Sequence, residues 1–583
     1  MRLLGAATIA LSALFVGCHA KPDDPAGQAE ELSDPVRREN AIANLQNLYT
    51  SRLAAADGDR SVETVQNDEG RDVPGPMGVA NASVGALTQT YLDHPEDAQN
   101  GERILNLLLE MQDPRAMPAF LKALDWRAEV SETHAITAAQ AIERMTLPDD
   151  QVEPAITAIS SALERVQGSR GVDNRMRIHF IRTLGHLGDR RATPILTSVA
   201  MRIHEDQSFL INIMAAEELG KLRDPAAVPT MIKALFLFAH NRPDQRMNDV
   251  GAQGLVQIGR PSLEPLTQLL AGENEEANRI ANNYVTAVRN ANAEAGANMD
   301  PRTVVVGEAC YALGQLGFRE SIDPLLGQVT PLTGMATADI GETQRPEISR
   351  ALSCVTSLVQ INREDSDTPR LRQALMDTYS HIPEEWPPEA PYTSRAQVLA
   401  AMQHTYDVGL LDFLHGIAAN REELFDFRVV AFIAHVMIAN RDEVGRDRAV
   451  IEAEPEGSEV RQRLEEFLPA IETAQECNDD LQCYIGKLGD SNPMVVRKAA
   501  YMIARYGRGN AAALTALIEH IDHNNVPVRG DVLYAIDWVA TEGSPEAVAE
   551  IERVRGVEEG RSSWNQIKEL AMAVRARLST RGG

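Results

Sequence analysis

The sequence predicts an all-α fold in which helical hairpins stack into an α-solenoid. An apolar stripe at Met176, Phe180, Leu184 and Leu187 has spacings of 4, 4 and 3, and Pro194 follows seven residues later. Spacings of 3 and 4 keep side chains on one face of an α-helix. The pattern returns at Ile211, Ala215, Leu219 and Leu222 with Pro229, at Met247, Gly251, Leu255 and Ile258 with Pro265, and at Val305, Ala309, Leu313 and Leu316 with Pro324.

Glycine and proline predict where the helices of each pair end and begin. Gly188, Gly259 and Gly317 follow the stripes and can end a first helix, because glycine readily adopts the left-handed backbone of many helix ends. A proline then fits the first turn of the second helix, where no intrahelical N–H is needed. Such first-turn prolines are expected at 118, 154, 194, 229 and 265. A pair with one open apolar side must stack on its neighbours.

Two segments carry the signature of a known repeat. Residues 311–317 read YALGQLG and precede Asp323-Pro324-Leu325, and LGKL at 219–222 precedes Asp224 and Pro229. They resemble the HEAT-repeat family, in particular its bilin-lyase-like subgroup, most clearly over about 98–330 and 490–555. The resemblance implies a superhelix whose concave surface, lined by the second helix of each pair, binds protein partners. The family contains scaffolds, adaptors and a few enzymes.

The charge balance of the chain is strongly acidic. Its 583 residues include 56 Lys and Arg against 84 Asp and Glu, a formal net charge of -28. Nucleic-acid binding needs a basic face that neutralises phosphates, so the composition disfavours DNA and RNA as partners. It also disfavours electrostatic adhesion to anionic lipid, and solubility is the simplest reason for the acidity.

The first 17 residues predict a lipoprotein signal peptide. Arg2 precedes an uncharged apolar run, residues 3–16, which is too short to span a bilayer. The run ends in LFVGC at 14–18, which resembles a bacterial lipobox. The resemblance implies cleavage before Cys18 and lipid on that cysteine, which would hold the chain on a bacterial envelope membrane, at the periplasmic face of the outer membrane. The alternative is an ordinary secretory signal cut after Ala20.

Polarity and periodicity divide the remainder of the chain into a cap, two repeat arrays and their connections. The polar, proline-containing residues before 34 predict a flexible tether. A terminal repeat must cover an otherwise exposed apolar face, which predicts irregular ends. The predicted parts are a tether at 18–33, a helical N-terminal cap at 34–97, a HEAT-repeat array at 98–439, an acidic linker at 440–459, and a second HEAT-like array with a C-terminal cap at 460–583.

Two inserts interrupt the first array. Residues 271–301 are rich in Asn and Ala and are expected to be partly helical, and residues 330–345 are expected to form a loop between the two helices of one pair. Inserts in repeat arrays often lie on the binding face, although neutral loop growth explains them equally well. Residues 440–459 are charged and weakly periodic, which predicts a hinge between the arrays.

Two cysteines lie close together in the second array. Cys477 and Cys483 have five residues between them, and in an exported protein such a pair predicts a disulfide that closes a small loop. A metal site is the less favoured alternative, because the two further ligands would have to be His520 and His523, which are remote in sequence.

The other two cysteines, Cys310 and Cys354, lie in the stripe helices of successive pairs. Cysteine behaves as a small apolar residue in protein cores. We therefore favour two buried, unbridged cysteines over a disulfide.

The sequence contains no recognised motif for catalysis or cofactor binding. It has no G-x-S-x-G, H-E-x-x-H, P-loop or G-x-G-x-x-G motif. Iron-binding members of the family use repeated His-Glu dyads, and His204-Glu205 is the one such dyad here. We predict no catalytic, metal or cofactor residues, and a membrane-anchored envelope scaffold that binds proteins through its HEAT-repeat surface. The alternative is an envelope enzyme, or a subunit of one, with an unrecognised site in an insert.

Overall fold

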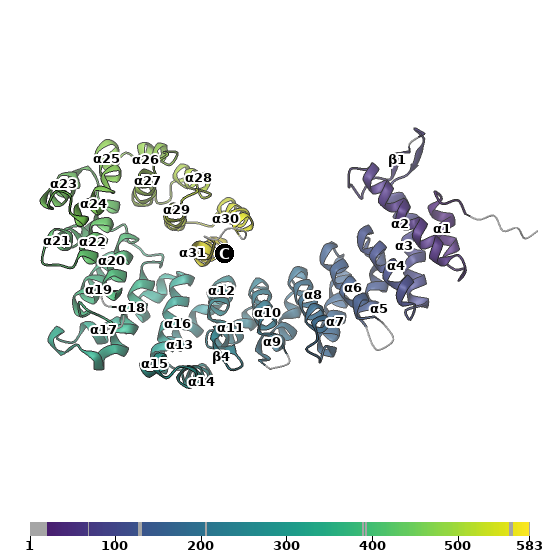
Figure 1. Cartoon of the computed structure of the whole chain (residues 1–583), viewed down its shortest axis with the longest axis horizontal. Coiled ribbons are helices and arrows are strands. Elements are labelled where there is room, and N and C mark those ends of the chain that lie inside the picture. The colour runs from purple at the N-terminus through teal and green to yellow at the C-terminus, as the bar shows by residue number, and fades with distance from the viewer. Residues whose placement is uncertain are drawn as a thin grey trace, which may run out of the picture. The chain divides into compact units, whose positions relative to one another are not determined.

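The structure is a computed structural model that describes residues 20–581, except 68, 126–130, 204–206, 388–389, 391–392 and 559–563. The chain divides into two compact units, residues 1–218 and 219–583, and the boundary lies inside helix α10 (Phe209–Lys221). Each unit is a row of paired helices (Figure 1). The predicted all-α solenoid is confirmed.

Unit 1 starts with a cap and continues in helical pairs. The cap contains three helices and a short antiparallel hairpin: α1 (Pro25–Glu31), α2 (Arg38–Ala55), β1 (Thr64–Gln66), β2 (Asp72–Pro74) and α3 (Pro76–Asp93). In each pair that follows, the first helix precedes the second: α4 (Ala98–Met111) and α5 (Met117–Leu124), α6 (Glu132–Arg144) and α7 (Asp149–Arg165), and α8 (Gly171–Leu187) and α9 (Thr193–Met201).

Unit 2 continues the same alternation. Its first helices are α12 (Asn248–Ile258), α16 (Pro301–Leu316), α18 (Arg345–Leu358), α20 (Thr393–Gln403), α22 (Phe425–Ile438), α27 (Pro493–Tyr506), α29 (Val526–Val539) and α31 (Trp564–Thr580). Its second helices are α11 (Val228–Ala234), α13 (Leu263–Ala271), α17 (Ile322–Thr333), α19 (Thr368–His381), α21 (Leu411–Ala419), α23 (Val444–Ala453), α28 (Ala511–Glu519) and α30 (Pro545–Glu558). Additional elements are the hairpin β3 (Phe238–Ala239) and β4 (Arg242–Arg246), and helices α14 (Glu275–Ala291), α15 (Ala293–Ala297), α24 (Glu459–Glu465), α25 (Leu468–Cys477) and α26 (Leu481–Lys487).

The predicted apolar stripes form the core of the pairs. Leu184, Leu219, Leu255 and Leu313 are fully buried, and the other stripe residues are buried too, except for the half-buried Leu187. Burial of one leucine side chain contributes about 1.5–3 kcal/mol, so a stripe of four residues outweighs the helix propensity of any single position.

The turn between the two helices of a pair often begins with an aspartate and has an alanine three residues later. Its aspartate caps a 3-10 turn that leads into the second helix, because the carboxylate accepts a hydrogen bond from the amide two residues further on. Its alanine is fully buried and lets this turn lie against the first helix. The three clearest copies are Asp113 with Ala116, Asp189 with Ala192, and Asp224 with Ala227.

Most of the predicted first-turn prolines are where the spacing places them. Pro118, Pro194 and Pro229 are each in the first turn of a second helix. Pro154 is not, because α7 begins five residues earlier, at Asp149, and encloses the proline. Asp149 and Asp150 form the first turn instead, where carboxylates interact favourably with the positive end of the helix.

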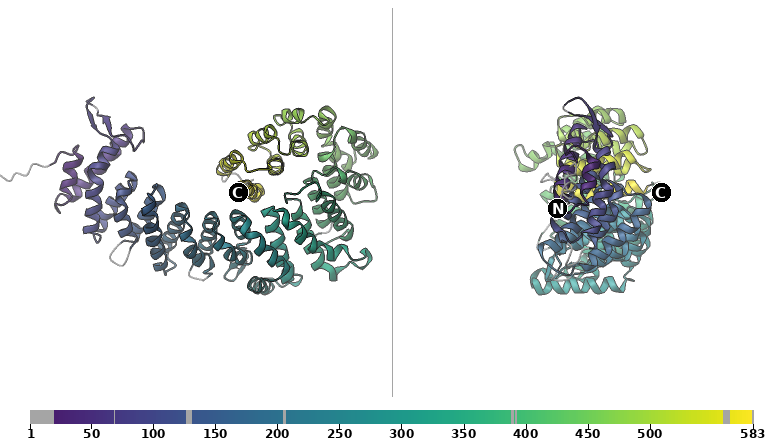
Figure 2. Two further views of the ribbon diagram at one scale, coloured as in Figure 1. Left: turned by 180° about the vertical axis from the view of Figure 1, so that it is seen from behind. Right: turned by 90° about the vertical axis from the view of Figure 1, so that its right-hand side faces the viewer.

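The first helices of unit 2 form a layer that closes on itself. Each packs against the next from α12 to α31, and α31 then packs against α12 and α16, which begin the row. The two opposite views show α31 inside the curve of this layer, with the second helices outside it (Figures 1 and 2). The concave surface of unit 2 is therefore lined by first helices, and the expectation of second helices there is wrong. First helices approach one another more closely, which makes theirs the shorter, inner layer.

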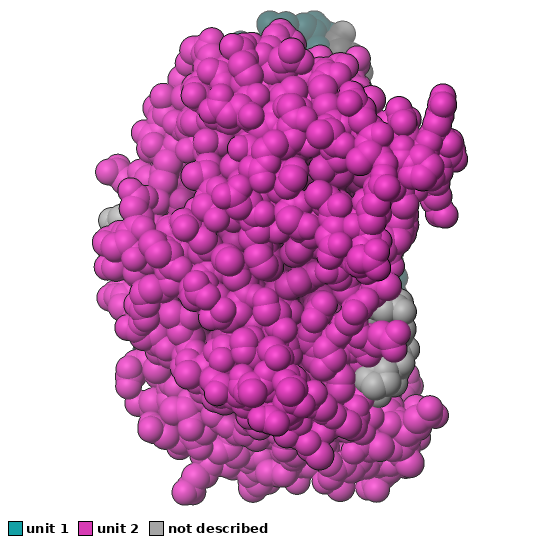
Figure 3. Space-filling model, turned by 90° about the vertical axis from the view of Figure 1, so that its left-hand side faces the viewer, with its two compact units in different colours: residues 1–218 teal, residues 219–583 magenta. Residues whose placement is uncertain are grey.

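Buried polar contacts hold α31 in this position. Arg577 is 3% exposed and donates hydrogen bonds to Asp537 of α29, with Nη2 to Oδ2 at 2.7 Å, and to the backbone oxygen of Gln315 of α16, at 2.6 Å. Burial raises the pKa of Asp537, but Arg577 and Arg581 outweigh this effect and hold the pKa below its usual range. Tyr311 adds a hydrogen bond to Glu569 at 3.0 Å. On the side that Figure 3 shows, unit 2 has a continuous surface.

The predicted acidic linker is wrong, because residues 440–459 include helix α23. Two of its carboxylates are partners of buried groups on α22: Asp447 lies 2.7 Å from His435 Nδ1, and Glu454 forms an ion pair with Arg428. A buried charged or polar group requires a partner. These two carboxylates therefore belong to the interior and are not the solvated charges of a linker.

Two other segments differ from expectation. Residues 20–33 contain α1 instead of a flexible tether, because Ala29 and Leu32 are buried. Residues 330–345 connect α17 to α18, which belong to successive pairs, so the prediction of a loop within one pair is wrong. Residues 271–301 contain α14 and α15 and are partly helical as predicted.

Cys310 and Cys354 form a disulfide in the structure, contrary to the preference for unbridged cysteines. Their sulfur atoms are 1.97 Å apart and their Cα atoms 5.0 Å apart, across α16 and α18. A small residue next to them allows this approach: a Cβ added to Gly314 would lie 2.8 Å from the side chain of Ser357. The two cysteines lie on different stripe helices in the sequence, but these first helices, α16 and α18, are in direct contact, which the stripe pattern does not indicate.

The amino group of Lys498 caps the end of helix α22 from a neighbouring first helix. Its side chain is fully buried, and Nζ donates to the backbone oxygens of Val436 at 2.7 Å, Met437 at 3.2 Å and Ala439. These carbonyls end α22 and have no intrahelical donor. Burial lowers the pKa of Lys498 to about 7.

The first prediction concerns the disulfides. Replacing Cys310 and Cys354 together by alanine is expected to lower the free energy of unfolding by about 3–4 kcal/mol, because the bond spans 44 residues of the unfolded chain. The matched Cys477→Ala, Cys483→Ala variant loses a bond that spans 6 residues and is expected to lose about 2 kcal/mol. Urea unfolding of the oxidised proteins, followed by circular dichroism, measures both. Equal losses of unfolding free energy in the two variants, or no loss when the wild-type disulfides are reduced, would contradict the assignment of these two disulfides.

The second prediction concerns Lys498. Lys498→Met is expected to lower the free energy of unfolding by about 2 kcal/mol, because buried carbonyls lose their donor. Between pH 7 and about 10 the unfolded lysine keeps a proton that the folded one has lost, so the unfolded state binds more protons and folding gains stability as pH rises. The difference between wild type and variant should therefore widen over this range in urea titrations. A difference that is constant with pH would show that the buried lysine does not titrate there.

Candidate functional site

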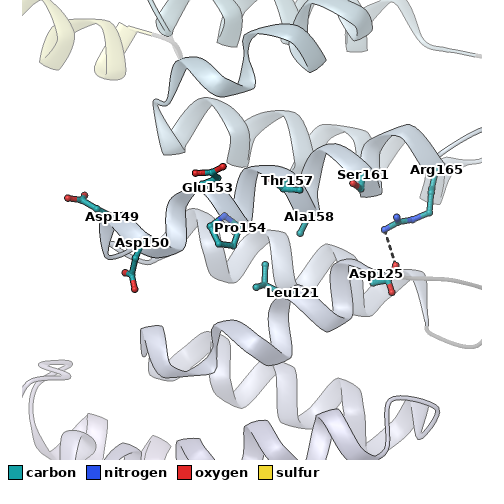
Figure 4. Close-up of a pocket in the computed structure, with 10 residues that line it drawn as sticks. All are labelled: Leu121, Asp125, Asp149, Asp150, Glu153, Pro154, Thr157, Ala158, Ser161 and Arg165. Atoms are coloured by element: carbon teal, nitrogen blue, oxygen red, sulfur yellow. Dashed lines mark ion pairs between the residues drawn. The ribbon is translucent and has the colours of Figure 1, made fainter.

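The second helices of unit 1 carry two neighbouring grooves. A groove between α5 and α7 has a volume of about 640 Å³ (Figure 4). A second groove, on the other side of α7 towards Arg191, has a volume of about 310 Å³. Both grooves share Glu153, Thr157 and Ser161, so they form one surface that runs along both sides of α7. We call this surface the α7 groove.

The α7 groove arises from the way the pairs pack. The first helices α4, α6 and α8 pack closely against one another, whereas α7 contacts α5 less closely and meets the next pair through α8 and the turn before α9. The gaps between second helices are therefore open to solvent. An open groove suits a chain segment of a partner better than a small molecule, because small-molecule sites enclose most of the ligand's surface.

The sequence of α7 is amphipathic. Ala155, Ile159 and Ala162 are fully buried and fix the helix against its neighbours. The opposite face carries Glu153, Thr157, Ser161 and Arg165 at intervals of four residues, which places them in one line along the groove. Leu121, Pro154 and Ala158 add apolar surface between these polar groups.

The two ends of the groove between α5 and α7 differ in charge. Asp149, Asp150 and Glu153 lie together at one end, and Arg165 lies at the other (Figure 4). Arg165 is already engaged, because its Nη2 donates to the backbone oxygen of Leu124 at 2.7 Å and lies 3.7 Å from Asp125 Oδ1. Asp149 and Asp150 are exposed and form no ion pair within the described residues.

Arg191 is the second cation of the α7 groove, and it is engaged as well. Its Nη2 lies 2.6 Å from Asp189 Oδ2 and its Nη1 lies 2.7 Å from Glu153 Oε2. The lining residues thus include five carboxylates, those of Asp125, Asp149, Asp150, Glu153 and Glu164, against two guanidinium groups that both have partners. The surface is complementary to positively charged groups.

Two small cavities lie in the described interior of unit 2. Cavities of about 10 Å³ and 20 Å³ lie beneath α31 and beside Trp538, and a single water molecule needs about 10–15 Å³. Histidine is present here, but His404 is stacked on Tyr534, with ring centres 4.1 Å apart, and burial lowers its pKa to about 3. It is a neutral packing residue.

The residues that the sequence singled out do not meet at one site. Cys18 and the His204-Glu205 dyad lie outside the described residues. The sulfur atoms of Cys477 and Cys483 are 1.92 Å apart, at the distance of a disulfide bond.

The histidines proposed as alternative metal ligands are occupied by local hydrogen bonds. His520 Nδ1 is 2.8 Å from the backbone oxygen of Ala516, and His523 Nδ1 accepts from the amide of Asn525 at 3.0 Å. Within the described part of the chain, no group of three or more His, Cys, Asp or Glu residues is arranged to hold a metal ion.

The α7 groove was not predicted from the sequence, although part of the pattern that marks it lies within a single helix. The four-residue spacing of Glu153, Thr157, Ser161 and Arg165 marks a polar line on a helix whose other face is apolar. The partner residues Asp125 and Arg191 come from the flanking pairs. Their approach depends on how the pairs stack, which the sequence pattern alone does not determine.

Comparison with known proteins identifies the repeat. Residues 213–236 match the PBS lyase HEAT-like repeat family. Similar solved structures include importin beta in an ammonium sulfate condition (11% identity, 95% of this chain and 70% of that chain, TM-score 0.33), Kap121p bound to Nup53p (12%, 93% and 54%, 0.29) and UNC-45 from Drosophila melanogaster (11%, 95% and 93%, 0.25). No curated protein matches the sequence. The matched residues thus contain a HEAT-like repeat, and the described helices on either side of them follow the same alternation of paired helices.

Proposed function

We propose that this protein is a non-catalytic scaffold that is held on a bacterial envelope membrane by lipid on Cys18 and binds protein partners through the α7 groove. The membrane would be the outer membrane and the protein would lie on its periplasmic face. A HEAT-repeat solenoid is typically a protein-interaction scaffold, since it presents a long surface built from many similar units. In the described part of the chain, no helix is both long and apolar enough to cross a bilayer. The anchor in this proposal is the lipid on Cys18.

The observation that carries the binding proposal is the unpaired negative charge of the α7 groove. Asp149, Asp150 and Glu164 have no ion-pair partner within the described residues, while the apolar groups of Leu121 and Ala158 lie between the polar ones. Protein interfaces combine such an apolar centre with complementary charges. The partner segment that fits is an extended chain or helix that carries Lys or Arg.

The chemistry of the groove supports binding rather than catalysis. Its lining residues include the hydroxyl groups of Thr157, Ser160 and Ser161, but no histidine, lysine or cysteine. A serine nucleophile requires a general base within hydrogen-bond reach, and none of the lining hydroxyl groups has such a partner among the described residues.

The third prediction tests the groove by site-specific photocrosslinking. A photoreactive phenylalanine analogue at Thr157 is expected to crosslink envelope proteins in intact membranes, because this exposed side chain lies in the middle of the groove. The same analogue at Thr286, an exposed threonine on α14, is the matched control and should give no adduct. Adducts are detected by mobility shift and identified by mass spectrometry.

Charge reversal separates groove binding from chance proximity. The double variant Asp149→Lys, Asp150→Lys should abolish the Thr157 adduct, because two carboxylates of the groove become two cations. The control variant Glu273→Lys, Glu275→Lys makes the same change in net charge elsewhere and should leave the Thr157 adduct unchanged. Equal adducts from Thr157 and Thr286, or an adduct that survives the first reversal, would contradict the proposal. Mass spectrometry of the mature N-terminus independently tests lipid on Cys18.

A further inference from the structure

Helix α1 is built into unit 1 from its first turn. Asp24 caps the helix by accepting from the amide of Gly27, and Pro25 occupies its first position. Pro25, Ala29 and Leu32 are buried, and α1 packs against both α2 and α3. The apolar residues of this short helix are therefore part of the cap core.

Hydrogen bonds extend this attachment to the first described residue. The amide of Ala20 donates to Glu31 Oε1 at 2.9 Å, and its carbonyl accepts from Gln28 Nε2 at 3.1 Å. Gln28 is itself buried and accepts from Asn44 of α2 at 3.0 Å. At the other end of α1, Arg38 Nε donates to the backbone oxygen of Leu32 at 3.0 Å. Residues 20–38 are thus held at both ends of the helix.

These contacts set a limit on the distance to the anchor. Cys18 precedes Ala20 by two residues, and two fully extended residues span about 7 Å. A lipid on Cys18 therefore enters the bilayer within about 7 Å of a fixed point on the folded cap. A flexible tether of the predicted 16 residues would have allowed several times that distance.

We infer that the α1 end of unit 1, formed by residues 20–24 and 33–37, lies directly against the headgroups of the membrane. This inference rests on the proposed lipid anchor and adds which surface of the protein faces the bilayer. Glu31 connects the two segments, because it accepts from Ala20 and lies 3.5 Å from Arg37 Nη1.

The chemistry of this end fits a zwitterionic headgroup layer. Val36, in the turn between α1 and α2, is 87% exposed, the most exposed large apolar side chain in the described part of the chain. Asp23, Asp24 and Asp34 outnumber Lys21 and Arg37 in the same two segments, so this end has no excess of positive charge to attract an anionic surface. Contact is thus maintained by the short covalent link and by Val36, without electrostatic adhesion.

The fourth prediction measures this contact by fluorescence quenching. The lipidated full chain carries one fluorophore, at Val36→Cys or at Leu210→Cys, in phosphatidylcholine vesicles that contain a lipid with a nitroxide on its headgroup. Leu210 is 55% exposed and lies on α10, so it is the matched control. The label at position 36 is expected to lose much of its fluorescence on binding, and the label at 210 is expected to be unchanged.

An insertion provides the second arm of the test. About 20 Gly and Ser residues inserted between His19 and Ala20 have an end-to-end distance of about 25 Å, which should abolish quenching at position 36 without reducing vesicle binding. If the protein binds the vesicles but the label at 36 is not quenched, or the labels at 36 and 210 are quenched equally, the inferred membrane-facing surface is wrong. The proposed lipid anchor would still stand. Quenching that survives the insertion would also overturn the inference. Unmodified Cys18 and no vesicle binding would overturn the anchor and the inference together.

Discussion

The packing of each first helix against the next is the constraint on which the rest of the structure depends. Leu184, Leu219, Leu255 and Leu313 are buried at equivalent positions of successive pairs, so every pair covers the apolar side of its neighbour. Because first helices approach one another more closely than second helices, two features follow. The row curves towards its first helices, which brings α31 onto α12 and α16 in unit 2. The second helices separate, which opens the α7 groove in unit 1.

The sequence predicts this fold well where the determining interactions are local. Spacings of 4, 4 and 3, a capping aspartate and a first-turn proline each act within one helical pair, and the pairs form largely as expected. The sequence predicts poorly what joins distant pairs. Arg577 and Gln315 are separated by 262 residues, and nothing near either residue marks the contact. Asp447 and Glu454 looked like charges of a linker because their buried partners, His435 and Arg428, lie on the preceding helix.

The N-terminal prediction failed for an instructive reason. Residues 18–33 are polar and contain two prolines, which is the composition of a tether. Burial of Ala29 and Leu32 is nevertheless enough to hold one short helix in place, because Gln28 and Glu31 also form hydrogen bonds with Ala20. The α7 groove was missed because its walls include Leu121, Asp125 and Arg191, which come from the neighbouring pairs. Together, the docked α1 and the acidic groove make unit 1 the part of the chain that carries both proposed contacts, one with the membrane and one with a protein partner.

Hydrogen exchange of the Arg577→Met variant tests whether α31 closes the first-helix layer of unit 2. Removal of the guanidinium group leaves Asp537 and the Gln315 carbonyl without one of their donors. If α31 closes the layer, amides of α12 and α16 in this variant lose protection together with those of α31. Arg575→Met, which removes a more exposed arginine from the same helix, should leave α12 and α16 protected. Loss of protection confined to α29 and α31 would contradict closure of the layer.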